Sequence, residues 1–195
     1  MTSPYDGKPS IKWESITKEL IGEHPLEMKE LRDIVFGCWT SIFESKFGAS
    51  GFRIGADIFP KPQIMGFLLH ELIPLELANR YPKKWRGEES AGDKDIVYVP
   101  EDLYSIEVKT SSNPSQIFGN RSYAQASTAG KKSKSGYYLA INFESCTKAN
   151  PTPGLTQVKF GWLDSSDWIG QKSATGQQAR LPPDVQNFKL LRIDR

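Results

Sequence analysis

The sequence contains little cysteine and histidine and has no long hydrophobic run. Its two cysteines, Cys38 and Cys146, are too few for a disulfide scaffold or for a zinc site of four thiolates, which favours a reducing cytoplasm. No apolar run approaches the roughly 18 residues that a membrane span requires, so a transmembrane protein is excluded. The polar start lacks the apolar stretch of a secretory signal. Two histidines leave few combinations for Ser-His-Asp or Cys-His catalysis.

The composition is typical of a protein with a sizeable core. Of the 195 residues, 38% are hydrophobic and 25% are charged. That length suits one compact domain, and that apolar fraction is too high for general disorder. We therefore expect a single domain over residues 1–195. Residues 1–10 are expected to form a loose N-terminal arm, because Pro4, Gly7 and Pro9 interrupt any regular pattern.

Charge is distributed unevenly along the chain. Residues 1–107 carry 13 basic and 18 acidic side chains, a net charge of −5, whereas residues 108–195 carry 12 basic and 5 acidic, a net charge of +7. Between Val108 and Phe143 there are five basic residues and no acidic one. A positive segment that follows an acidic cluster favours a polyanion bound beside a metal site, although a solvated basic face has the same charge pattern.

The pattern of apolar and breaking residues indicates both helices and strands. Apolar residues at helical spacing predict helices over residues 11–20, 25–47, 64–79 and 122–129. Pro74 is expected to kink or end the third of these. Runs rich in β-branched and aromatic residues predict strands over residues 52–59, 95–99, 105–110, 137–143, 158–163 and 188–193. Residues 81–93 and 164–183 are polar and are expected to be loops. This order predicts a mixed α/β fold, with a central β-sheet flanked by helices.

Three charged residues stand on one predicted hairpin. Glu107 and Lys109 lie two positions apart and therefore share a face of their strand, and the hairpin brings Asp95 to the same site. Two carboxylates bind a hard cation such as Mg²⁺ and leave positions for water and phosphate oxygens. The cation acidifies a water and neutralises charge developing on phosphorus, while Lys109 orients that water or stabilises the anionic transition state.

The same Glu-x-Lys spacing also has a simple structural explanation, because it is common on exposed strands. Here, however, Ile106 and Val108 alternate with the charged pair. Ile96 and Val97 follow the aspartate, so both strands are expected in the core. A carboxylate and a lysine on a core strand need a functional or structural reason.

The arrangement of these residues resembles the PD-(D/E)XK nuclease superfamily. That pattern is an aspartate at the start of one strand and Glu-x-Lys on the next, followed by a helix and another strand. The matching segments, in order, are Asp-Ile-Val-Tyr-Val (95–99), Ile-Glu-Val-Lys-Thr (106–110) and Tyr-Tyr-Leu-Ala-Ile-Asn-Phe (137–143). Lys94 stands where the pattern has proline. The resemblance implies a restriction-endonuclease-like core, a nuclease domain, and metal ligation by Asp95, Glu107 and the carbonyl of Val108.

A narrower resemblance is to ScaI-like type II restriction endonucleases. It rests on Glu-Val-Lys-Thr-Ser-Ser (107–112), Gln-Ile-Phe-Gly-Asn-Arg-Ser-Tyr-Ala-Gln (116–125), Gly-Trp-Leu-Asp (161–164) and Asp-Trp-Ile-Gly-Gln-Lys-Ser-Ala-Thr-Gly-Gln-Gln-Ala-Arg-Leu (167–181). It implies Mg²⁺-dependent hydrolysis of both strands at a short, specific, palindromic double-stranded DNA site, with one or two ions per active site. It further implies a cytoplasmic homodimer and a cognate DNA methyltransferase that acts on the same site without forming a stable complex.

Two acidic positions remain open on the sequence alone. Asp93 is an alternative to Asp95 as the metal-binding aspartate, although Asp95 abuts the apolar strand. Many superfamily members use an acidic residue on the helix before the hairpin, and Glu71 matches it as an assisting catalytic residue. Glu76 is a weaker match, and an exposed helical glutamate is an equally good explanation for Glu71. His70 and Glu71 begin no zinc-protease motif, because residue 74 is a proline.

The polar segment after the Glu-x-Lys strand is predicted to contact DNA, although a polar loop that caps the next helix is the alternative. Forked amide and guanidinium groups suit base edges, and hydroxyl and ammonium groups suit phosphates. The predicted base contacts are Asn113, Gln116, Asn120 and Arg121. The predicted phosphate contacts are Ser112, Ser122, Tyr123, Lys131 and Lys132. Residues 164–181 are a second candidate recognition loop.

Two other functions fit parts of the pattern. A repair or recombination nuclease of the same superfamily would recognise DNA structure in place of sequence. A non-catalytic DNA-binding module would keep the fold without cleavage. The complete set of Asp95, Glu107 and Lys109 argues against the module, and the base-reading character of residues 111–125 argues mildly against the repair nuclease.

Overall fold

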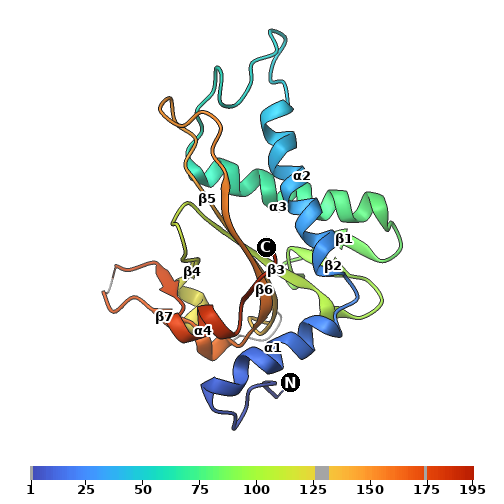
Figure 1. Cartoon of the computed structure of the whole chain (residues 1–195), viewed down its shortest axis with the longest axis vertical. Helices are drawn as coiled ribbons and strands as arrows, with labels where there is room; N and C mark the ends of the chain where they lie inside the picture. Colours follow the sequence, from blue (N-terminus) through green and yellow to red (C-terminus); the bar gives the residue numbers. More distant parts are fainter. Residues whose placement is uncertain (1, 126–131, 174) are drawn as a thin grey trace.

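The computed structural model describes residues 2–125, 132–173 and 175–195, and its helices surround a central sheet (Figure 1). The helices are α1 (Trp13–Gly22), α2 (Met28–Glu44), α3 (Pro62–Arg80) and the short α4 (Pro183–Phe188). Short 3-10 turns are η1 (Ser10–Lys12), η2 (Asp102–Tyr104), η3 (Arg121–Ala124) and η4 (Ser165–Asp167). The architecture is therefore α/β, as the sequence predicts.

The strands form a large and a small sheet. In spatial order, the large sheet consists of β1 (Trp85–Gly87), β2 (Ile96–Tyr98), β3 (Ile106–Ser111), β5 (Gly136–Phe143), β6 (Leu155–Leu163) and β9 (Leu191–Arg192). Its pairing is antiparallel except between β3 and β5. The small antiparallel sheet consists of β4 (Phe118–Asn120), β8 (Gln178–Arg180) and β7 (Ile169–Gly170).

The alternation of side chains along β5 separates two cores on opposite faces of the large sheet. Tyr137 and Leu139 pack into the core that α2 and α3 cover. Tyr138 and Ala140 pack into the other core, together with side chains from the small sheet and α4. Glu107 is paired with Tyr138 in the parallel β3–β5 register, so Glu107 faces the small sheet. Figure 1 likewise shows α2 and α3 together, apart from β4, β7 and α4.

The predicted helices over residues 11–20, 25–47 and 64–79 are confirmed, with shifted ends. Pro74 lies inside α3 and does not end it, although it provides no N–H for the carbonyl of His70 one turn earlier. The buried side chains of Leu69, Ile73 and Leu77 keep this helix packed on either side of the proline. Burial therefore outweighs the local cost of the proline.

Two local predictions are wrong and a third is confirmed only in part, and turns or short elements explain each difference. Residues 52–59 form no strand: Gly51 and Gly55 have positive φ, and the carbonyl of Arg53 accepts turn hydrogen bonds. The loop predicted over residues 81–93 contains β1, anchored by the buried Trp85. The strand predicted over residues 188–193 is shortened to β9, because α4 extends to residue 188.

Two further segments differ from their predicted states. The loop predicted over residues 164–183 contains η4, β7 and β8, because Trp168, Ala179 and Leu181 are buried against the second core. Of the helix predicted over residues 122–129, the structure shows the 3-10 turn η3, and residues 126–129 lie outside the described residues. The predicted recognition segments are thus partly built from one small sheet.

The N-terminal segment is anchored at Tyr5, which differs from the loose arm predicted over residues 1–10. Tyr5 is buried, its hydroxyl lies 2.8 Å from that of Thr17, and its ring faces the ammonium of Lys189. Ser3 also donates a hydrogen bond to Asp164. Burial of Tyr5 and the hydrogen bond from Ser3 thus anchor a segment whose prolines and glycine give it no regular structure.

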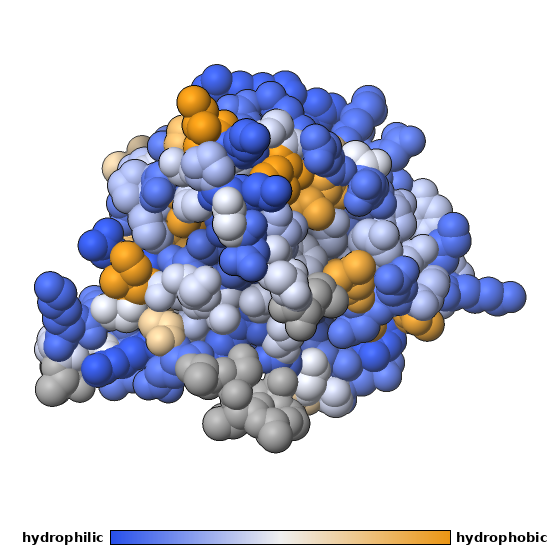
Figure 2. All heavy atoms as spheres, turned by 90° about the horizontal axis from the view of Figure 1, so that it is seen from below, coloured by the Kyte–Doolittle hydropathy of each residue, from blue (hydrophilic) through white to orange (hydrophobic). Residues whose placement is uncertain are grey.

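One face of the molecule shows the character of its surface. The face drawn in Figure 2 is mainly hydrophilic, with hydrophobic atoms in small separate groups. Scattered apolar side chains of this kind are normal on protein surfaces. No helix among the described residues has the length and apolar character needed to cross a bilayer.

Candidate active site

The edge of β2 and the middle of β3 bring three predicted catalytic residues together. Asp95 directly precedes β2, and Ile96 pairs with Ile106 at the start of β3. Glu107 and Lys109 then project to the same face of β3, because side chains two residues apart share a face. The hairpin geometry that the sequence predicts is therefore present.

Asp95 is held by the backbone of β3. Its Oδ2 accepts a hydrogen bond of 2.7 Å from the N–H of Val108, the residue between the charged pair. The same oxygen lies 3.6 Å from Nδ1 of His70, on α3. Burial lowers the pKa of His70, against the effect of the Asp95 carboxylate. The backbone bond fixes this carboxylate next to Glu107.

Glu107 is almost fully buried, with 2% of its surface exposed. Its Oε1 lies 2.6 Å from Nζ of Lys109 and also accepts a hydrogen bond from the Tyr123 hydroxyl. Burial alone would raise the pKa of Glu107, but Lys109, Lys132 and the Tyr123 hydroxyl together lower it to about 2. Glu107 is therefore an anion at neutral pH.

Lys132 completes this charged cluster. Its Nζ lies 3.2 Å from Oδ1 of Asp95 and 2.9 Å from Oε2 of Glu107. Burial opposes the charge of Lys132, but the two carboxylates outweigh burial and raise its pKa. Oε2 of Glu107 is buried, and the geometry of its ammonium contact is not that of a hydrogen bond. Among the described residues, this carboxylate oxygen therefore has an ion-pair partner but no hydrogen-bond donor.

The oxygens at this site suit a hard divalent cation. Asp95 and Glu107 offer carboxylate oxygens, and the carbonyl of Val108, 3.1 Å from Nζ of Lys109, belongs to the same stretch of β3. Within the described ranges, no group of three or more His, Cys, Asp or Glu side chains forms a metal cluster. Any metal here would thus depend on two carboxylates, backbone oxygen and water, a donor set that Mg²⁺ accepts.

The two rival acidic residues have other partners. Asp93 forms an ion pair of 2.8 Å with Arg86 and accepts backbone hydrogen bonds from Glu89 and Ser90. These contacts, the Arg86 hydrogen bond above all, lower the pKa of Asp93 to about 2. Glu76 pairs with Arg80 on the exposed side of α3. Asp93 and Glu76 are thus paired with arginines, whereas Asp95 lies beside Glu107.

A hollow of about 310 Å³ adjoins Asp95. Glu71 lines it from α3 and is exposed, and His70 and Glu88 line it as well. Glu71 thus lies near the charged cluster, with no ion pair to Lys109 among the described residues. His70 and Glu88 were not expected from the sequence. In the sequence, they could have been found only from their positions, because His70 is next to Glu71 and Glu88 directly follows β1.

A larger cleft of about 890 Å³ extends from His70 and Glu71 along the polar segment after β3. Gln63 and Phe67 of α3 form one wall, and Phe67 is 58% exposed although it is apolar. Other lining residues are Thr110, Ser111, Ser112, Asn113, Pro114, Phe118 and Gln178. Two of the predicted DNA contacts, Ser112 and Asn113, therefore line the cleft, and Gln178 of the predicted loop over 164–181 joins them.

Asn113 and Gln116 shape the segment as well as offering polar groups. Oδ1 of Asn113 accepts backbone hydrogen bonds from Ser115 and Gln116. The buried Asn142 of β5 donates to the carbonyls of Asn113 and Gln116. The loop is thus fixed to the sheet, and the acceptor atom of Asn113 is already engaged. Asn120, at the end of β4, is exposed.

The remaining predicted DNA contacts lie around η3. Arg121 directs its guanidinium to the carbonyls of Ser173 and Gly176, which ties η3 to the loop before β8. Ser122 is exposed, and its carbonyl accepts a hydrogen bond from Lys134. Tyr123 is buried, and its hydroxyl faces Glu107, which differs from its predicted place on a phosphate. Lys132 likewise faces the carboxylates, and Lys131 lies outside the described residues.

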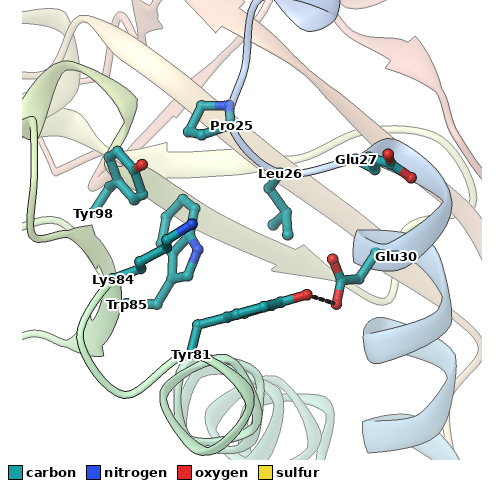
Figure 3. A pocket seen from close by; sticks show the side chains of 8 residues that line it. All are labelled: Pro25, Leu26, Glu27, Glu30, Tyr81, Lys84, Trp85 and Tyr98. Carbon is teal, nitrogen blue, oxygen red and sulfur yellow. Dashed lines mark hydrogen bonds between the residues drawn. The ribbon is translucent and has the colours of Figure 1, made fainter.

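A separate cavity of about 350 Å³ lies between the start of α2 and the β1–β2 strands (Figure 3). Tyr81 crosses it and donates a hydrogen bond of 2.8 Å to Glu30. Trp85 and Tyr98 form an aromatic wall, with ring centroids 4.6 Å apart. The described lining of this cavity includes none of the predicted site residues. The candidate active site is thus the cluster at Asp95 and Glu107 with the adjoining cleft.

Comparisons with known proteins agree on one family. The ScaI restriction endonuclease family matches residues 3–194. The type II restriction enzyme ScaI of Streptomyces caespitosus is 52% identical over 193 residues, which cover 98% of this chain and 84% of that protein. No solved structure matches the chain.

Proposed function

Because the chain belongs to the ScaI restriction endonuclease family, we propose that it is a Mg²⁺-dependent type II enzyme that cleaves both strands of a short, specific, palindromic double-stranded DNA site. The observation that carries the chemistry is the meeting of Asp95, Glu107 and Lys109 on adjacent strands, with Lys109 2.6 Å from Glu107. Carboxylates and a lysine at this spacing suit hydrolysis of a phosphodiester by water.

We propose that the sheet around these residues is a PD-(D/E)XK core. Three features support this: an aspartate before β2, Glu-x-Lys on the antiparallel β3, and β5 parallel to β3. Helix α3 lies before the hairpin and carries Glu71 beside the site. This order agrees with the superfamily pattern except at the helix expected between Glu-x-Lys and the next strand, where the described residues form the 3-10 turn η3.

Asp95, Glu107 and the carbonyl of Val108 would hold the metal ion. Their fit is supported by the oxygen donor set, by the buried Oε2 of Glu107 without a hydrogen bond, and by the ammonium of Lys132 between the two carboxylates. When bound, Mg²⁺ supplies acidification of a water and neutralisation of the charge that develops on phosphorus. Glu71, beside Asp95, would assist by holding a second ion or a water.

Lys109 would act at the chemical step. Its ammonium contacts Oε1 of Glu107 and the carbonyl of Val108, so it stands beside the proposed ligands. The face of the Tyr123 ring lies 4.8 Å from Nζ, which limits where the ammonium can move. From this position Lys109 would orient the attacking water or stabilise the anionic transition state.

The cleft beside the charged cluster would bind the duplex. Ser112, Asn113 and Gln178 line it, and their polar groups suit base edges and phosphates. A palindromic site would be matched by a homodimer with twofold symmetry, in which each subunit cleaves one strand. We further propose a cytoplasmic location and a cognate DNA methyltransferase that protects the same site without forming a stable complex.

Plasmid cleavage tests the proposal. Purified protein is incubated with plasmid DNA and Mg²⁺, and with Mg²⁺ replaced by a chelator. Discrete fragments that require Mg²⁺ are expected. Cleavage limited to branched or flapped DNA would instead indicate a repair or recombination nuclease, and retarded DNA without cleavage would indicate a binding module.

A further inference from the structure

Lys132 occupies the space between the two carboxylates of the candidate site. Its Nζ contacts Oδ1 of Asp95 at 3.2 Å and Oε2 of Glu107 at 2.9 Å. The lysine lies four residues before β5 and reaches the cluster from outside the β2–β3 hairpin. Its side chain is 27% exposed, whereas that of Glu107 is 3% exposed. The ammonium therefore covers the outer side of a buried anion.

Neighbouring lysines have different partners. Lys109 contacts the other oxygen of Glu107, Oε1. Lys134 donates to the backbone carbonyls of Ser122 and Gln125. Lys94 donates to the carbonyl of Ser135. In the part of the chain that the structure describes, Lys132 is thus the lysine that joins both carboxylates.

The oxygens that Lys132 contacts are the ones that would bind the metal. A divalent ion bound by Asp95 and Glu107 would lie within about 2.0–2.6 Å of their oxygens, in the space that the ammonium fills. Two cations in that space would also repel each other strongly in a partly buried site. The ammonium and the metal therefore exclude each other.

We propose that Lys132 is a built-in counter-ion that closes the metal position in the metal-free protein and is displaced when a divalent cation binds. This inference rests on the proposed function, because it requires the metal site at Asp95 and Glu107. The lysine relieves repulsion between the two carboxylates and lowers the affinity for the metal. Once displaced, its ammonium is free to attract a DNA phosphate, so a bound duplex would favour metal binding.

Metal binding to the DNA-free protein tests this inference without any cleavage assay. Mn²⁺ affinity is measured by calorimetry for the unaltered chain, for Lys132→Met and for Lys134→Met. Lys132→Met removes the charge, keeps an apolar stem of similar length, and should tighten Mn²⁺ binding about tenfold, equivalent to roughly 1.4 kcal/mol. Lys134→Met, which removes a nearby lysine whose partners among the described residues are the carbonyls of Ser122 and Gln125, should leave the affinity unchanged. Equal or weaker Mn²⁺ binding by Lys132→Met overturns the proposal.

A second measurement uses the unaltered chain, so its result does not depend on whether a variant folds. Lysines are acylated briefly with an activated acetate ester, with and without saturating Ca²⁺, and the modified sites are quantified by mass spectrometry. Labelling of Lys132 should rise severalfold with Ca²⁺, while labelling of Lys134 stays constant. Unchanged labelling of Lys132 would contradict displacement.

The variant Asp95→Asn separates failure of this inference from failure of the proposed metal site. If Asp95→Asn abolishes Mn²⁺ binding and Lys132→Met does not tighten it, the metal site stands and the counter-ion role is wrong. If Asp95→Asn leaves Mn²⁺ binding unchanged, the ion binds elsewhere, and both proposals are wrong.

Discussion

The hydroxyl of Tyr123 donates a hydrogen bond to Oε1 of Glu107, the oxygen opposite the one that faces Lys132. The two oxygens of this carboxylate thus have different surroundings. Oε1 is fixed by Tyr123 and Lys109, and Oε2 is left to a cation. Because the ring of Tyr123 packs against Trp168, its hydroxyl is held in place by the second core.

Tyr123→Phe should therefore weaken the site without removing a ligand. Loss of a residue that orients a metal ligand typically costs about 10- to 100-fold in metal affinity or activity. We expect this loss in both Mn²⁺ affinity and cleavage rate. Tyr138→Phe is the control, because the Tyr138 hydroxyl donates to the carbonyl of Lys134 and not to Glu107. Equal losses in the two variants would mean that Tyr123 is only structural.

Asp95→Asn and Glu107→Gln should each abolish cleavage while the fold is kept. Both changes remove a negative charge, so DNA binding without metal should persist or tighten. Asp93→Asn is the matched control, because Asp93 pairs with Arg86 and should be needed for local stability and not for cleavage. Plasmid cleavage and circular dichroism measure the two effects. Full activity of either purified site variant would refute the assignment.

Lys109→Ala should act mainly on the chemical step. Positioned acid–base groups typically contribute about 10²–10⁴-fold to a rate, so the single-turnover rate should fall by at least about 100-fold, with a small change in DNA affinity. If Lys131 contacts phosphate, Lys131→Ala should instead weaken binding to every DNA sequence. The slope of log affinity against log salt concentration should then fall in magnitude by about one unit. If both variants changed affinity alone, Lys109 would have no chemical role.

Arg121→Ala should reduce discrimination between cognate and random DNA. Its guanidinium holds the carbonyls of Ser173 and Gly176, so its loss should loosen the loop that leads to Gln178 in the cleft. Affinity for cognate and random duplexes is compared at one salt concentration, with Ca²⁺ in place of Mg²⁺. Arg121→Lys keeps the positive charge but not the planar guanidinium that reaches both carbonyls, so it should not restore discrimination. An equal loss of affinity for both duplexes would mean that Arg121 attracts DNA phosphates and has no effect on sequence discrimination.

The buried His24 should make stability depend on pH. Burial lowers the pKa of His24 to about 4, whereas an unfolded histidine has a pKa near 6.5. Between these values the unfolded chain binds the proton more tightly, so stability falls as the pH falls from about 6.5 to 4, by up to about 3 kcal/mol. The free energy of unfolding, measured with urea at several pH values, should depend less steeply on pH for His24→Gln than for the unaltered chain. The same dependence on pH in both proteins would mean that His24 does not cause it.

The geometry of β3 and Asp95 was predictable because it depends on local rules. Alternation places Glu107 and Lys109 on one face of β3, and the apolar Ile106 and Val108 identify the strand as buried. The short hairpin then determines where Asp95 lies. Each step uses residues close in sequence, so the sequence alone was sufficient for this geometry.

The partners of Glu107 from elsewhere in the chain were not predictable in this way. Tyr123 and Lys132 reach Glu107 from the long connection between β3 and β5, which has no period that fixes side-chain direction. His70 approaches Asp95 from α3, where a histidine next to Glu71 gave no motif. The small sheet was not predicted because its short strands have single buried residues, such as Ala179, between polar neighbours, so the sequence shows no apolar run there.

The parallel pairing of β3 with β5 has an evolutionary consequence. A parallel partner cannot be reached by a tight turn, so the 24 residues between Ser111 and Gly136 form a long crossover connection, and its described residues include β4 and η3. That crossover contains the predicted DNA contacts Ser112 to Lys132, while the proposed catalytic residues Glu107 and Lys109 lie on β3. Substitutions at Ser112 and Asn120 in this connection would therefore alter which sequence is cut with little effect on hydrolysis. Tyr123 and Lys132, in the same connection, contact Glu107, so substitutions at these two positions would change the chemistry as well.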